Sequence, residues 1–371
     1  MTSLHRSRAL WAALLALLCA GVLAACGDTK DSTDSSSASS GGAAASTTAD
    51  SSDSGAAASS DGSYRSGLTA VVMPKQLGNP YEELEDSGTV EAFRDLGGKA
   101  TIEGPTDAGA SSQVPLLQSD IQKEPDAIIL AANDPNAVAP VLKQAIQKGI
   151  RVVAQDSDAA PDARQIFINQ ATTESIGEEL ARMAKQVVPG GRGEIAVLSA
   201  TANATNQNAW IRILRDQLAT PEYSGLRLDK IAYGDDDDQK SFQETQGLLS
   251  AYPNLRAIVA PTTVGIAAAA RYLSTSPKKG QVSVTGLGTP DQMRKFVKDG
   301  TTRIFALWNP EDVGYLGGYA AAALSSGIIT GREGDTFRAG RLGDRRVGAN
   351  GEVVLGPPTE FTARNIDDFH F

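Results

Sequence analysis

Short runs of consecutive apolar residues alternate with helix-length segments, and this alternation restricts the possible folds more than any other feature of the chain. The strand-length runs lie at 68–73, 127–130, 151–154, 195–198, 257–260, 282–285 and 303–307. The helical patterns lie at 80–96, 136–148, 172–188, 206–218, 239–251, 265–273 and 292–298, and Gly149 is the predicted stop of the second helix. Unbroken β-branched runs are typical of strands buried on both faces of a parallel sheet. The sequence therefore predicts an α/β protein with a repeated strand–helix unit.

The part of the chain that carries this pattern is long enough for two domains. It begins near residue 67 and comprises about 300 residues. Single hydrophobic cores stop growing at roughly 250–300 residues, and longer chains divide. We therefore expect two doubly wound domains, each built around its own parallel sheet.

The first 25 residues have the composition of an export signal. Two arginines precede an uncharged, Ala- and Leu-rich run from 9 to 25, and small residues then lead directly into Cys26. An ordinary signal peptide or a single membrane span are the alternatives, although the run is marginal for a hydrocarbon core of about 30 Å. The segment resembles the lipobox of bacterial lipoproteins. That resemblance implies that Cys26 is acylated and that the protein is anchored to the cell membrane, on its periplasmic side or outer face.

A low-complexity segment, 26–66, follows the predicted signal. It is made almost entirely of Ser, Ala, Gly, Thr and Asp. Such a composition cannot bury enough apolar surface to offset the entropy of ordering, so we predict a disordered linker. Its r.m.s. span would be roughly 35 Å, which would hold a folded body away from the membrane.

The remaining composition argues against catalysis and against nucleic-acid binding. The chain has only two cysteines, Cys19 in the predicted signal and Cys26, and beyond the signal it has one histidine, His370. Neither a thiol-based site nor a histidine-based metal site or catalytic triad is expected, and no phosphate-binding loop or complete dinucleotide motif occurs. We therefore predict no cofactor, no metal and no enzymatic activity. The formal net charge of −10 disfavours nucleic acid as a partner.

An acidic run, 235–238, has two interpretations. Four consecutive aspartates suggest a calcium site, but they lack the alternating spacing and closing glutamate of an EF-hand loop. The run more simply includes the N-cap of the helix that follows, where acids are favoured by the helix dipole.

Polar side chains are concentrated just after the predicted strands, where an α/β protein binds its ligands. The candidates are Lys75, Asn79, Asp156, Asp158, Asn206, Gln207, Pro261, Thr263, Trp308 and Asn309. Carboxylates and amides pair with adjacent hydroxyl groups, and an indole face covers the apolar side of a sugar ring. The set predicts a neutral, polyhydroxylated ligand.

Several of these segments, taken together and in order, resemble a known family. They lie at 74–80, 155–158, 168–172, 205–210, 260–263, 306–310 and 365–369. The chain from 68 to 371 is similar to periplasmic-type sugar-binding proteins of the ribose-binding class, and within it to the rhamnose-binding and autoinducer-2-binding proteins of ABC importers. This resemblance implies a monomer that binds a monosaccharide by closing two domains about a hinge. The closed form would then dock onto membrane permease subunits.

The resemblance also implies discontinuous domains. In this fold class the chain crosses the hinge three times, and we place the crossings near Gln170, Trp308 and Phe337. The N-terminal subdomain would then comprise 67–170 and 308–337, and the C-terminal subdomain 171–307 and 338–371.

Binding residues can be carried over from the autoinducer-2-binding relatives. Those proteins hold the ligand with a Lys after the first strand, an Asp in an Asp-Ser-Asp segment, an Asp-Gln pair and a Pro-x-Ala segment. Lys75, Asp156, Gln207 and Pro261 agree with this pattern. Asn206 replaces the Asp of the pair and Thr263 replaces the Ala. These two departures favour rhamnose or a related monosaccharide over autoinducer-2.

Other interpretations remain open at the sequence level. Asp156 fits a turn cap as well as a ligand contact, Asn206 and Gln207 fit helix-capping amides, and Trp308 fits hinge packing as well as ring stacking. The function also has an alternative, because a sensory protein that presents a bound sugar to a membrane receptor would carry the same cleft.

Overall fold

The computed structural model describes residues 62–371, and the predicted signal peptide, Cys26 and residues 27–61 of the linker lie outside the described residues. A first sheet has six strands, all parallel, in the order β13-β5-β4-β3-β1-β2. These strands are β1 (Thr69–Met73), β2 (Lys99–Ile102), β3 (Ala127–Leu130), β4 (Arg151–Gln155), β5 (Ile166–Asn169) and β13 (Glu352–Val354). The central strands β3 and β4 are almost wholly buried, as their unbroken apolar sequences predict.

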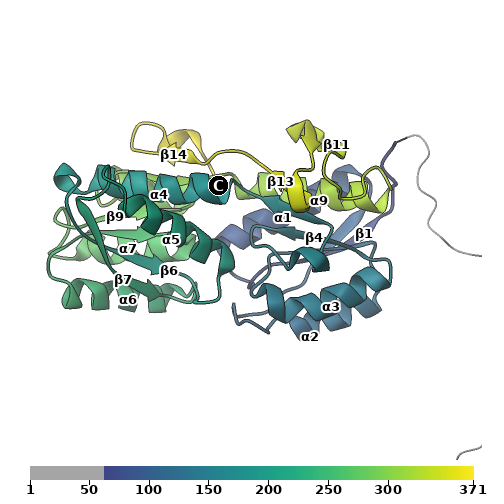
Figure 1. Ribbon diagram of the computed structural model, residues 1–371, viewed down its shortest axis with the longest axis horizontal. Helices are drawn as coiled ribbons and strands as arrows, with labels where there is room; N and C mark the ends of the chain where they lie inside the picture. The colour runs from purple at the N-terminus through teal and green to yellow at the C-terminus, as the bar shows by residue number, and fades with distance from the viewer. Residues whose placement is uncertain (1–61) are drawn as a thin grey trace, which may run out of the picture. The chain divides into compact units, whose positions relative to one another are not determined.

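Helices cover both faces of this sheet (Figure 1). The helices α1 (Pro80–Asp95) and α9 (Pro310–Ser325) pack against each other on one face, and α2 (Val114–Gln122) and α3 (Pro135–Gln147) cover the other. The helix α3 shows why these segments end where they do. Asp134 caps its N-terminus, Pro135 occupies its first position, and Gly149 follows it with a φ of 87°.

A second sheet has four parallel strands in the order β7-β6-β8-β9. These strands are β6 (Gly193–Ser199), β7 (Leu226–Tyr233), β8 (Leu255–Ala260) and β9 (Ser283–Gly286). The helices around it are α4 (Thr173–Val187), α5 (Thr205–Leu218), α6 (Asp238–Ala251), α7 (Thr263–Thr275) and α8 (Pro290–Lys298). The pair α4 and α5 covers one face and the pair α6 and α7 covers the other (Figure 1).

Short antiparallel pairs complete the described chain. The strand β10 (Phe305–Leu307) pairs with β14 (Thr359–Phe361), and β11 (Thr336–Arg338) pairs with β12 (Asp344–Arg346). A backbone bridge between Leu287 and Ala306 places β10 next to β9. None of the helices within residues 62–371 has the length and apolar character that a membrane span requires.

The chain passes between the two sheets at three places. It leaves the first sheet after β5 at 170–172, returns between β10 and α9 at 308–309, and leaves again between β13 and β14 at 355–358. The structure differs from the predicted third passage near Phe337, with 338–371 in the second subdomain. The strand β13 instead pairs with β5 in the first sheet. The segment between Phe337 and β13 is polar, with three-residue strands, and so carries no hydrophobic period that marks its sheet.

The predicted strands and helices are confirmed, but others were missed. The sequence pattern does not predict β7, because this strand lies at the edge of its sheet and has no unbroken apolar run. The sequence pattern does not predict α9 either. Nearly all residues of this helix are buried, so it has no polar face and no amphipathic period.

Candidate functional site

A cavity lies between the carboxyl ends of the two sheets, as expected for parallel α/β architecture. Of the residues that the sequence analysis proposed, those that line the cavity are Lys75, Asn79, Asp156, Asn206, Gln207, Pro261, Thr263 and Trp308. They come from loops and helix starts that follow β1, β4, β6, β8 and β10. The fold thus gathers side chains that are up to 233 residues apart in the chain.

Lys75 and Asp156 form an ion pair at the centre of the cavity. The Nζ atom of Lys75 donates to Oδ2 of Asp156 at 2.5 Å, and both side chains are nearly fully buried. Burial alone would lower the pKa of Lys75, but the charges of Asp156 and Glu82 outweigh this effect and raise the pKa above its ordinary value. Lys75 is therefore a charged donor. Its main-chain oxygen accepts from the side chain of Asn133 at 2.9 Å, which fixes the loop after β1.

Asp156 accepts hydrogen bonds from three side chains. In addition to Lys75, the hydroxyl of Tyr81 donates to its Oδ1 at 3.2 Å and the amide of Asn206 donates to its Oδ2 at 3.2 Å. Asn206 belongs to the second sheet's side of the cavity, whereas the other groups belong to the first. The backbone of Asp156 has a φ of 55°, in the left-handed region that is uncommon for residues other than glycine. Backbone strain of this kind is found at functional sites.

The second sheet's side of the cavity contributes Gln207, Pro261 and Thr263. The side-chain carbonyl of Gln207 accepts from the Ser199 hydroxyl at 2.7 Å and from the main-chain N–H of Ala200 at 2.9 Å. These bonds fix the orientation of the Gln207 amide and leave its nitrogen to donate to a ligand. Thr263 begins α7 and is buried, and Pro261 shapes the adjacent wall.

Three aromatic side chains form one wall. The indole N–H of Trp308 donates to the Tyr81 hydroxyl at 2.7 Å, and the two rings meet edge to face. Trp308 also contacts Trp210 at a centroid distance of 6.1 Å. Trp308 thus lies at the second passage between the sheets and also lines the cavity. The hinge and the ligand-facing interpretations of this residue therefore describe the same position.

Two further carboxyl groups line the cavity. Burial raises the pKa of Glu82 to about 7, although Lys75 lowers it, and Glu82 accepts from the main-chain N–H of Lys75 at 3.2 Å. Burial also raises the pKa of Asp236, whose Oδ1 accepts from the Thr262 hydroxyl. Asp236 has a φ of 50°, so it shares the left-handed backbone of Asp156.

Asp158 and Asn309 do not line the cavity. The carboxylate of Asp158 forms a bidentate ion pair with Arg164, with both N–O distances at 2.7 Å. Asn309 caps α9 by accepting from the N–H of Glu311 at 3.0 Å. The side chains of Asp158 and Asn309 thus bind other parts of the protein. A position at the end of a strand does not by itself tell such a side chain from one that lines the cavity.

Other cavity residues were missed by the sequence analysis. They are Tyr81, Glu82, Trp210, Asp236, Thr262, Leu287 and Leu307. Tyr81 and Glu82 follow directly on the proposed segment 74–80, so one further helical turn would have included them. Asp236 was assigned with its neighbours to helix capping. Asp237 does cap α6, but Asp236 faces the cavity.

The cavity is small in this structure. The volume open to the centres of water molecules is about 40 Å³. By the same measure, one water molecule needs roughly 10–15 Å³. A larger ligand would enter only if the two sides move apart. The lining can donate and accept hydrogen bonds and can cover an apolar surface. The arrangement suits binding of a small polar molecule.

Comparison with known proteins places the chain in a family. The profile of the periplasmic binding protein domain matches residues 70–328. The chain belongs to the periplasmic binding protein family. Its members are extracytoplasmic ligand-binding proteins and not enzymes, which confirms the expected fold and class.

Solved structures resemble this periplasmic binding protein over nearly their whole length. A sugar ABC transporter protein from Actinomyces odontolyticus ATCC 17982 is 49% identical over 82% of this chain and 98% of that chain, with a TM-score of 0.67. An ABC transporter solute-binding protein from Clostridium phytofermentas, with bound L-rhamnose, is 36% identical over 82% of this chain and 99% of that chain, with a TM-score of 0.80.

A curated relative is matched over a shorter length. The D-ribose/D-allose-binding protein of Pseudomonas aeruginosa is 27% identical to this periplasmic binding protein over 199 residues. That match covers 51% of this chain and 60% of the relative.

Proposed function

We propose that this protein is the sugar-binding component of a carbohydrate ABC importer and that its ligand is L-rhamnose or a related monosaccharide. The rhamnose-bound relative from Clostridium phytofermentas supports the choice of ligand, and the sugar ABC transporter protein from Actinomyces odontolyticus supports the role in import. In this proposal Lys75, Asp156, Asn206 and Gln207 bind the hydroxyl groups of the sugar.

The observation that supports this proposal is that the Lys75–Asp156 ion pair lies next to the aromatic wall. A sugar ring presents hydroxyl groups around its edge and an apolar face. The charged pair and the amides supply partners for the hydroxyls, and charge-assisted hydrogen bonds of this kind are the strong ones. Trp308, Tyr81 and Trp210 supply the apolar contact, which the 6-methyl group of rhamnose also requires.

Asn206 favours a sugar over autoinducer-2. Its amide donates to Asp156 at 3.2 Å. The autoinducer-2-binding relatives carry an aspartate at the matching position, and an ionised aspartate would set two carboxylates against each other there. Because an amide both donates and accepts, it suits another arrangement of hydroxyl groups. A site built for one pattern rejects ligands that leave its buried polar groups unpaired.

Ligand capture would proceed by motion about the three passages between the sheets. Asp156 and Asn206 contact each other from opposite sides of the cavity, and the space between them is too small for a sugar. The two sides must therefore separate to admit the ligand and close over it afterwards. A permease would then bind the closed form.

We also propose that acylated Cys26 anchors the protein to the membrane. The proposal rests on the resemblance of the segment around Cys26 to a lipobox and on the low-complexity linker behind it. The folded part would act as a monomer on this tether.

Isothermal titration calorimetry of the purified, non-acylated chain tests the ligand. The titrants are L-rhamnose, L-fucose, D-ribose, D-allose, D-arabinose and autoinducer-2. We expect L-rhamnose or a close deoxyhexose to bind most tightly, with a one-to-one stoichiometry. Tight binding of autoinducer-2 together with no binding of rhamnose would refute the ligand assignment, and no binding of any sugar would refute the proposed function.

A further inference from the structure

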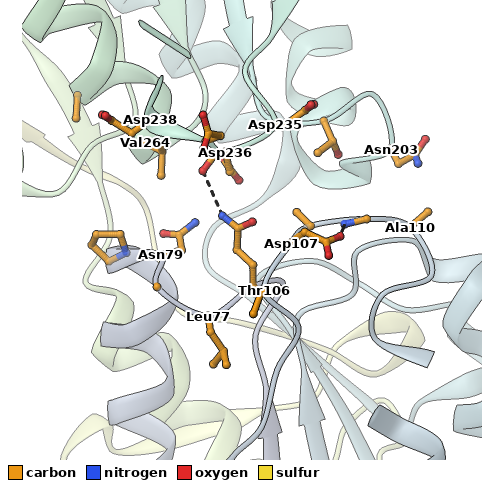
Figure 2. Close-up of a pocket in the computed structure, with 18 of the residues that line it drawn as sticks. Leu77, Asn79, Thr106, Asp107, Ala110, Asn203, Asp235, Asp236, Asp238 and Val264 are labelled. Atoms are coloured by element: carbon orange, nitrogen blue, oxygen red, sulfur yellow. Dashed lines mark hydrogen bonds between the residues drawn. The ribbon is translucent and has the colours of Figure 1, made fainter. Parts of the chain in front are cut away.

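A second, larger hollow adjoins the cavity. It is open to solvent, has a volume of about 900 Å³, and shares Asn79 and Asp236 with the cavity. Figure 2 shows its two sides: Thr106, Asp107 and Ala110 lie opposite Asn203, Asp235 and Asp238. We call it the outer groove. Since the cavity and the groove share residues, a ligand that outgrew the cavity would extend into this groove.

One hydrogen bond spans the boundary between the cavity and the outer groove. The side-chain amide of Gln76 donates to the main-chain oxygen of Asp236 at 3.2 Å, drawn as a dashed line in Figure 2. Gln76 lies in the loop after β1 and Asp236 in the loop after β7, so the bond joins the sides of the two sheets. The neighbours of each partner face inward, because Lys75 lines the cavity and the Asp236 carboxylate accepts from Thr262.

Residues 234–237 connect β7 to α6, and we call them the Asp236 loop. This loop holds the main-chain carbonyl of Asp236 in position. Asp235 and Asp236 both have a positive φ, and Asp237 caps α6 by accepting from the N–H of Lys240. The main-chain N–H of Asp235 also donates to the Ala200 oxygen at 3.0 Å. Backbone that is held at unusual angles by caps and by neighbouring strands has little freedom to move aside for a substituent.

We propose that Gln76 and the Asp236 loop form a gate that limits the ligand to a single sugar ring. The inference rests on the proposed function and adds the length of the ligand to it. In this proposal a free monosaccharide lies on the cavity side of the Gln76–Asp236 bond, so the two sides can close over it and form the bond again. A glycoside whose substituent points toward the outer groove occupies the place of the Gln76–Asp236 bond, so the protein closes around it only by giving up that bond and displacing the Gln76 side chain.

The test compares a monosaccharide with its glycosides. The purified chain is titrated by calorimetry with L-rhamnose, with the α- and β-methyl rhamnosides and with p-nitrophenyl α-L-rhamnoside. We expect the wild-type protein to bind the free sugar at least tenfold more tightly than p-nitrophenyl rhamnoside. This factor combines a lost hydrogen bond, roughly a 2- to 12-fold effect, with the displaced side chain.

Two substitutions at Gln76 test the gate itself. Gln76→Ala removes both the bond and the bulk, and Gln76→Glu keeps the bulk but turns an acceptor toward the Asp236 oxygen. Both variants should reduce the discrimination between rhamnose and p-nitrophenyl rhamnoside to about threefold or less. Asn203→Ala, an exposed residue of the outer groove away from the gate, should leave it unchanged. Thermal unfolding of each variant verifies that it is folded.

Two results would overturn the gate. One is a wild-type protein that binds rhamnose and the glycosides equally well, and the other is a discrimination that persists in both Gln76 variants. A wild-type protein that binds neither these sugars nor any monosaccharide of the earlier panel would instead overturn the proposed function, and the gate with it. The failures are thus distinguishable.

Discussion

Asp156 is the residue on which the proposed site depends, because its carboxylate joins Lys75, Tyr81 and Asn206. Asp156→Asn keeps the shape of the side chain but removes the charge that pairs with Lys75. We expect a loss of roughly a hundredfold or more in sugar affinity, since hydrogen bonds to charged groups contribute about 1.5–3 kcal/mol each. Calorimetry with the best-binding sugar measures this loss.

A matched control is available for this variant. Asp162→Asn changes an exposed aspartate that pairs with Lys143 outside the cavity, and its affinity should equal that of the wild type. Melting temperatures show whether Asp156→Asn is folded. If a folded Asp156→Asn protein bound sugar with near-normal affinity, the sugar-binding site would not include Asp156.

Asp86 determines a dependence of stability on pH. This residue is buried on α1, and its Oδ1 atom has no hydrogen-bond partner. Burial, followed by the neighbouring Glu82 and Glu83, raises the pKa of Asp86 to about 8. The folded protein therefore binds this proton more tightly than the unfolded chain, whose aspartate pKa is about 4. The stabilisation is complete below pH 4 and is lost as the pH rises through 8.

Asp86→Asn removes the ionisation and nearly preserves the shape. We expect the variant to melt several degrees above the wild type at pH 8.5, because about 1 kcal/mol shifts the melting temperature by roughly 2–4 °C in a domain of this size. The advantage should shrink steadily toward pH 4.5. Circular dichroism melts across this pH range measure it, and a difference that does not vary with pH would contradict the assignment.

At the scale of elements, the close packing of α1 against α9 is the most demanding feature. A Cβ atom at Gly314 of α9 would overlap the main-chain oxygen of Glu85 on α1, and the Thr89 hydroxyl donates to the Gly314 oxygen at 2.9 Å. A side chain at this point would force the helices apart, and α1 carries residues that line the cavity. Tyr81 and Glu82 lie in the first turn of α1.

Gly314→Ala should therefore destabilise the fold by roughly 1–3 kcal/mol, the range for overpacking in a core. The exposed Gly247 of α6 is the matched control, because nothing lies within 4 Å of a Cβ built there. Gly247→Ala should stabilise the protein by about 0.5–1 kcal/mol through helix propensity. Urea unfolding measures both values. Effects of the same sign in the two variants would show that helix packing does not control this position.

At the scale of the whole molecule, the proposed anchor predicts a change of location without a change of fold. Cys26→Ser removes the residue to which the lipid would be attached, and Cys26 lies outside the described residues. We expect the variant to leave the membrane fraction and to bind sugar with wild-type affinity, because the folded part is separated from residue 26 by the linker. Cell fractionation and calorimetry test the two expectations. Retention of a processed Cys26→Ser protein in the membrane would contradict a lipid anchor.

The sequence alone determined the class of fold and much of the cavity. Buried parallel strands are unbroken apolar runs, and amphipathic helices repeat their apolar residues every turn, so both kinds of element can be recognised locally. The carboxyl ends of parallel strands meet at one edge, which is why Lys75, Asp156 and Gln207 could be proposed together. The edge strand β7 and the buried helix α9 lacked these periods, since one is half solvated and the other has no solvated face.

Tertiary structure alone decided the contacts that cross the fold. It directed Asp158 to Arg164 and Asn309 to the start of α9, and it turned Asp236 toward the cavity although its neighbour Asp237 caps a helix. It also carried β13 into the first sheet. Each of these outcomes depends on a partner distant in the chain or on the backbone angles of one loop. Hydrophobic periodicity indicates whether a residue is buried, but it does not indicate which other residue that residue contacts.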